Sequence, residues 1–65
     1  MIGIVDSDCN ASVHEKPSIF SEVVCELSPS TRVEIDEQAS TQEYYKICTP
    51  AGVEGYCLKI YFSVE

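Results

Sequence analysis

The side chains best suited to chemistry in this sequence are a single histidine, His14, and four cysteines. A histidine can activate a thiol such as Cys9 as a nucleophile, but that chemistry also needs an orienting group and an oxyanion site, usually in a cleft. A chain of 65 residues offers no obvious place for such a cleft. We therefore expect His14 to be a solvated loop side chain, and the protein to be a non-enzyme without catalytic residues.

The cysteines are Cys9, Cys25, Cys48 and Cys57, an even number that permits complete disulfide pairing. None lies in a C-x-x-C pair, the spacing from which structural zinc usually draws its ligands, so we expect no metal site and no cofactor. Each has hydrophobic or strand-like neighbours, which favours reduced, buried thiols that act as small hydrophobic side chains. One or two disulfides remain the alternative.

The charge balance restricts the partners. The chain has a net charge of −7, from 11 acidic and 4 basic side chains. Nucleic-acid binding needs clustered Lys and Arg, but the bases here are scattered among acids, and an anionic membrane would repel the chain. We therefore expect a partner that is neutral or basic, and neither nucleic acid nor membrane.

The amino-terminal residues carry no export signal that we recognise. Residues 1–10 lack both a basic region and a long apolar region, so they do not form a signal peptide. The longest apolar runs are also too short for a membrane-spanning helix. We expect a cytoplasmic protein if this is the full-length chain, and an exported or cell-wall-associated one if it is a fragment of a larger protein.

Short runs of β-branched and aromatic residues, separated by turn residues, predict strands. The alternation at residues 32–36 places Val33 and Ile35 on one face and charged side chains on the other. The expected strands are residues 2–5, 23–27, 32–36, 44–48 and 53–57, with one helical turn in 58–62 before a last short strand. This pattern predicts one small all-β domain over residues 1–65, a barrel or a sandwich.

The segment Thr-Pro-Ala-Gly at residues 49–52 defines a hairpin. Proline at the second turn position and glycine at the fourth predict a type I turn with Gly52 at positive φ. This turn sets the register of the two strands. On the core side, Thr49 pairs with Val53, Ile47 with Gly55 and Tyr45 with Cys57. On the outer side, Cys48 pairs with Glu54, Lys46 with Tyr56 and Tyr44 with Leu58.

Two consequences follow from this register. Tyr44 and Tyr56 share an outer face that a core does not require, diagonally about 7–8 Å apart. Cys48 points outward and Cys57 inward, so we expect no disulfide between them. The expected core consists of Val13, Leu27, Val33, Ile35, Tyr45, Ile47, Val53, Cys57 and Ile60.

Four motifs in order resemble the bacterial SH3 (SH3b) domain family. The family pattern L-N-V-R-x-G-P-S is matched by residues 11–18, and V-I-G-x-L followed by V-x-V is matched by residues 23–27 and 32–35. The patterns G-W-Y-K-V and G-W-V-x-x-x-Y-L are matched by residues 43–47 and 55–62. The resemblance covers nearly the whole chain and implies a small SH3-like barrel of five or six short antiparallel strands.

The chain also departs from the family pattern. Both tryptophans are replaced, by Tyr44 and Tyr56, and the loop arginine and glycine are replaced by His14 and Lys16. A further glycine is replaced by Cys25. The resemblance therefore implies the barrel without fixing one particular ligand.

The resemblance also implies a function. SH3b domains typically serve as accessory modules that bind cell-wall peptides or peptide segments, or that pack against an attached hydrolase. We accordingly expect a non-catalytic module that binds a peptide, protein or peptidoglycan fragment. Tyr61 stands where the family carries a groove tyrosine, so Tyr44, Tyr56 and Tyr61 are the candidate ligand-binding row.

Acidic side chains complete the candidate site. Asp36, Glu37 and Glu43 flank the polar loop beside Tyr44, and such a loop borders the groove in SH3-like folds, so these acids could select a basic ligand. Two simpler alternatives stay open: the tyrosines only cover a thin core, and the acids form a solvated face. The alternative function is a structural or regulatory interaction domain that binds itself, a cytosolic partner or an attached hydrolase.

Overall fold

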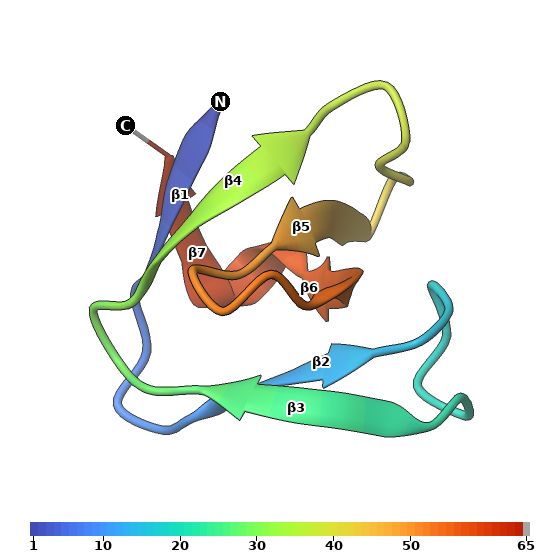
Figure 1. The fold of residues 1–65 in the computed structure, drawn as a ribbon, viewed down its shortest axis with the longest axis horizontal. Coiled ribbons are helices and arrows are strands. Elements are labelled where there is room, and N and C mark those ends of the chain that lie inside the picture. Colours follow the sequence, from blue (N-terminus) through green and yellow to red (C-terminus); the bar gives the residue numbers. More distant parts are fainter. Residues whose placement is uncertain (65) are drawn as a thin grey trace.

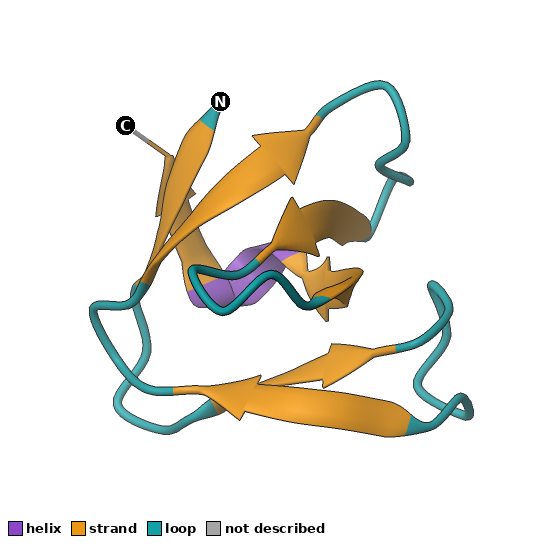
Figure 2. Cartoon of the chain, viewed as in Figure 1, coloured by secondary structure: helices purple, strands orange, loops and turns teal. Residues whose placement is uncertain are grey.

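The computed structural model describes residues 1–64 of the chain. This part folds into seven short antiparallel strands joined by loops and one helical turn (Figure 1). The strands are β1 (Ile2–Val5), β2 (Ala11–His14), β3 (Val23–Leu27), β4 (Arg32–Asp36), β5 (Tyr44–Cys48), β6 (Glu54–Leu58) and β7 (Phe62–Val64). The one helical element in this range is a 3₁₀ turn, η1 (Lys59–Tyr61), between β6 and β7 (Figure 2). No helix within residues 1–64 is long and apolar enough to cross a membrane.

The expected fold class, a small all-β domain, is confirmed. Residues 1–64 form seven strands where five or six were predicted. The additional strand is β2, whose sequence Ala-Ser-Val-His has little β propensity of its own. It becomes a strand because it pairs with β3 on one side and with β6 on the other. Four alternating residues of weak β propensity are too short a signal to predict a strand alone, so the pairing with β3 and β6 decides this element.

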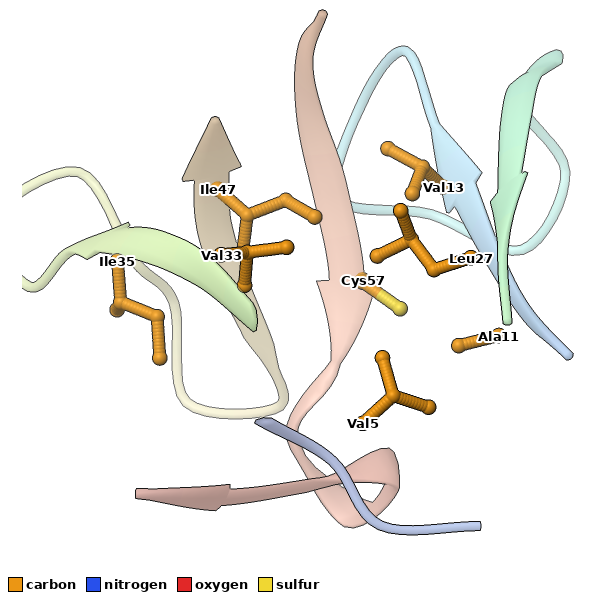
Figure 3. Close-up of a cluster of buried hydrophobic side chains, with 8 residues drawn as sticks. All are labelled: Val5, Ala11, Val13, Leu27, Val33, Ile35, Ile47 and Cys57. Carbon is orange, nitrogen blue, oxygen red and sulfur yellow. The ribbon is translucent and has the colours of Figure 1, made fainter. Parts of the chain in front are cut away.

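The strands form one curved sheet in the order β3-β2-β6-β5-β4-β1-β7. In Figure 1, β2 and β3 make one layer and β4 and β5 face it across the molecule. The inward side chains of the two layers meet between them and make the core (Figure 3). A sheet that folds back on itself is how a chain this short encloses an apolar interior.

The predicted hairpin is confirmed in every pair. Strands β5 and β6 pair Tyr45 with Cys57, Lys46 with Tyr56 and Tyr44 with Leu58, as the turn sequence required. The turn closes with a hydrogen bond from the Gly52 N–H to the Thr49 carbonyl at 2.9 Å, and Gly52 has φ +85°. Thr49 is buried, and its hydroxyl accepts a hydrogen bond from the Val53 N–H at 3.1 Å, which fixes the end of the hairpin.

Most of the predicted core is buried. The buried hydrophobic side chains are Val5, Ala11, Val13, Leu27, Val33, Ile35, Tyr44, Ile47 and Cys57. Tyr45 and Val53 were predicted to be buried and are only half-buried, although Tyr45 packs against the core. The helical turn predicted in residues 58–62 is present as η1. Ile60 was predicted to be in the core and is 79% exposed, because no residue of this turn is buried.

The four cysteines are free thiols in different environments. Cys57 is buried and Cys25 and Cys48 are half-buried, in agreement with thiols that act as small hydrophobic side chains. Cys9 is exposed, contrary to that expectation, because it lies in the loop between β1 and β2. Cys48 and Cys57 lie on opposite faces of the hairpin, so a bond between them would require the backbone to move.

Candidate functional site

One line of side chains crosses five neighbouring strands on the outer face of the sheet. Residues that lie directly opposite each other in antiparallel strands share a face. The opposed pairs run from Val23 to His14, from His14 to Tyr56, from Tyr56 to Lys46 and from Lys46 to Asp36. We call Val23, His14, Tyr56, Lys46 and Asp36 the outer row.

Tyr56 is the aromatic centre of the outer row. Its side chain is half-buried, and the Lys46 ammonium lies 5.0 Å from the centre of its ring. A cation over the face of a tyrosine is attracted by the negative charge of the ring face. Tyr56 therefore offers a hydroxyl and a ring, with one side of the ring taken by Lys46.

Tyr44 lies on the same outer side, as predicted, but it is not an exposed groove residue. It is only 6% exposed, and the ring of His14 meets it edge-on, with the ring centres 6.5 Å apart and the planes at 87°. Burial raises the pKa of Tyr44, and the negative charge of Glu43 adds to that rise. The prediction that Tyr44 stands free was wrong, because its side chain is buried and the His14 ring of β2 packs against it.

Tyr61 has a mixed role. It ends the 3₁₀ turn, is half-buried and packs against the hydrophobic core. Its carbonyl accepts a hydrogen bond from the Asp6 N–H at 2.7 Å, which ties the turn to the end of β1. Part of its side chain remains accessible and is available to contact a ligand. Its packing against the core holds the ring in place.

The three predicted acidic residues differ in their surroundings. The Asp36 carboxylate accepts hydrogen bonds from the backbone N–H groups of Gln38 at 3.1 Å and Ala39 at 3.4 Å, so it shapes the turn after β4. Glu37 and Glu43 are exposed at the two ends of the loop between β4 and β5. Asp36 therefore stabilises the turn after β4, whereas Glu37 and Glu43 contribute negative charge to the surface.

Three residues of the outer row, Val23, His14 and Lys46, were not predicted as site residues, and His14 differs most from its prediction. It was expected to be a solvated loop side chain, but it belongs to β2, is half-buried and contacts Tyr44. Its Nδ1 lies 3.2 Å from the Ser21 carbonyl, so the tautomer protonated at Nδ1 donates a hydrogen bond there. The signal was present in the alternation of β2, where Ala11 and Val13 are buried and His14 takes the other face.

A hollow of about 120 Å³ adjoins the outer row. It is lined by Glu34, Ile35, Asp36, Lys46, Ile47, Cys48 and Glu54. In the register of β4, β5 and β6, Cys48 lies between Glu34 and Glu54, so carboxylates flank the thiol on both sides. Among residues 1–64, no group of three or more histidine, cysteine or acidic side chains is arranged to hold a metal ion.

Comparison with known proteins identifies a family. The model of the family described as "Bacterial SH3 domain" matches residues 10–63, most of the chain. The match spans β2 to β6 completely and includes all five residues of the outer row. A comparison with curated protein sequences gave no significant match.

Proposed function

The chain belongs to the bacterial SH3 domain family, and on this premise we propose that it is a binding module for a short peptide or peptidoglycan fragment. Domains of this family are generally non-catalytic binding modules. The single observation that carries the proposal is the outer row, which crosses five strands and brings one accessible tyrosine, one histidine and one lysine into line on its three middle strands.

The dimensions of the outer row suit a short extended ligand. Neighbouring strands lie about 4.8 Å apart, so four intervals span about 19 Å, the length of about six residues of extended chain. Tyr56 supplies ring area and a hydroxyl near the middle of that span. Val23 at one end is exposed and gives an apolar contact.

The charges along the outer row favour a neutral or basic ligand. Asp36 and the adjacent Glu37 place negative charge at the β4 end of the row, and Glu43 adds a carboxylate next to the start of β5. Lys46 already occupies one side of the Tyr56 ring, so a ligand ammonium group either displaces it or stacks on the other side. Exposed carboxylates act mainly on the rate of encounter, and this rate falls with added salt.

The test is calorimetric titration with wall stem peptides, peptidoglycan fragments and basic peptides. We expect Tyr56→Ala to weaken binding by at least about 1 kcal/mol, or about fivefold, because an aromatic anchor is lost. Val64→Ala is the control, since this exposed side chain lies on β7, at the far end of the sheet from β3. The proposal fails if no ligand binds the wild type, or if the two variants bind equally well.

A further inference from the structure

A second surface lies at the corner where the loop between β2 and β3 meets the start of β3 (Figure 1). Four hydrophobic side chains are exposed there within six consecutive residues: Ile19, Phe20, Val23 and Val24. Phe20 is 93% exposed. We call these four residues the loop–edge patch, and of its members only Val23 also belongs to the outer row.

The loop that carries Phe20 is held by its own hydrogen bonds. The Ser21 hydroxyl lies 2.7 Å from the Ser18 carbonyl and 3.0 Å from the Lys16 carbonyl. The Phe20 N–H donates to the Ser18 hydroxyl at 3.1 Å. The exposed ring is thus mounted on a backbone that is already ordered, which lowers the entropy lost when a partner covers it.

Strand β3 presents a free edge beside this loop. It lies at one end of the sheet, and among residues 1–64 it pairs only with β2. Its sequence, Val-Val-Cys-Glu-Leu, has high β propensity and contains neither lysine nor proline. The register with β2 shifts at Val24, so the regular part of this edge is Cys25 to Leu27. The opposite end of the sheet, β7, is only three residues long.

Acidic side chains outnumber basic ones around the loop–edge patch, where Glu15, Glu22 and Glu26 lie against the single Lys16. Glu15 and Glu22 face each other at the base of the loop, where the Glu15 N–H donates to the Glu22 carbonyl at 2.8 Å. A hollow of about 300 Å³ opens beside them, lined by Glu15, Lys16, Ser18, Phe20, Ser21 and Glu22. Glu26 is exposed further along β3. Carboxylates next to an accessible aromatic ring are complementary to lysine and arginine side chains.

These observations select the occupant. A second copy that paired with β3 would bring its own Glu22 and Glu26 to an edge where Glu22 and Glu26 of this chain are already exposed, and like charges close together are unfavourable. Two chains of net charge −7 also repel one another, and the same charge opposes an anionic membrane surface. An extended segment of alternating apolar and basic residues is not repelled in this way, because its positive side chains are attracted to the carboxylates at this edge.

We propose that the loop–edge patch docks an extended, basic segment of a partner protein, which adds to the sheet as a strand beside β3 while Phe20 and Val24 contact its apolar side chains. Strand addition gives affinity through main-chain hydrogen bonds and selectivity through alternate side chains. This interaction does not depend on the ligand proposed for the outer row.

The experiment uses a synthetic peptide of alternating lysine and valine, with an alternating glutamate and valine peptide as the comparison. Nitrogen-15 NMR of the complete chain is expected to show peptide-induced shifts at residues 19–26 with the basic peptide. Phe20→Ser is expected to weaken its binding at least fivefold, as loss of an exposed anchor commonly does. Glu26→Lys is expected to weaken binding of the basic peptide and to strengthen binding of the acidic peptide.

Matched variants separate this proposal from the others. Ile60→Ser removes an equally exposed apolar side chain outside the loop–edge patch and is expected to leave peptide binding unchanged. Tyr56→Ala, the variant that tests the outer row, is expected to leave the shifts at residues 19–26 unchanged. The proposal is overturned if the basic peptide does not bind, if both peptides bind equally, or if the shifts map to Tyr56. Sedimentation that shows β3-dependent dimers of the chain alone also overturns it.

Discussion

Replacing Ile47 by alanine is the sharpest test of the core. Ile47 is 1% exposed in the middle of β5, opposite Gly55 and Ile35, so the substitution empties space that neighbouring strands enclose. Removing its methyl and methylene groups loses about 2.5 kcal/mol of transfer free energy, and a partly relaxed cavity adds about 1 kcal/mol. The total of about 3–4 kcal/mol is a large part of the 3–10 kcal/mol typical of a domain this size.

The assay is urea unfolding followed by circular dichroism and tyrosine fluorescence, with Ile60→Ala as the matched control. Ile60 loses the same atoms but is 79% exposed, so its free energy of unfolding should change by less than about 0.5 kcal/mol. Equal costs for the two variants would refute the assignment of Ile47 to the core and Ile60 to the surface. So would an Ile47→Ala cost below about 1 kcal/mol.

Two further predictions concern Gly55 and Cys57. A Cβ at Gly55 would lie 2.7 Å from the His14 backbone carbonyl, so Gly55→Ala should cost about 1–3 kcal/mol in urea unfolding. Gly3→Ala should cost less, because a Cβ there meets side chains and no backbone: the end of Ile35 at 2.6 Å and the Phe62 ring at 3.3 Å. Burial raises the pKa of Cys57 to about 11, so the folded state keeps this proton where the unfolded thiol loses it. The stability from this group should therefore be complete below about pH 9 and decline from pH 9 to 11; a rise in that window would contradict the argument. In the native state, iodoacetamide followed by mass spectrometry should modify exposed Cys9 much faster than Cys57, and equal rates would show that Cys57 is accessible.

The sequence alone determined the hairpin of β5 and β6 in full. A turn with proline and glycine at fixed positions sets the register, and strict alternation then decides which side chains share a face. This is why the pairs of Tyr56 with Lys46 and of Cys57 with Tyr45 were predicted correctly. The same local rule placed Val33 and Ile35 in the core.

Only the tertiary structure decided what covers each face. Alternation assigned Tyr44 to the outer side, but its burial depends on His14, which β2 brings from 30 residues earlier in the chain. Ile60 illustrates the converse case, because a helical turn was predicted there, but only the placement of that turn on the sheet shows that this apolar side chain faces solvent. The outer row likewise exists only because β2 pairs with β6, a contact between segments about 40 residues apart that no local pattern specifies.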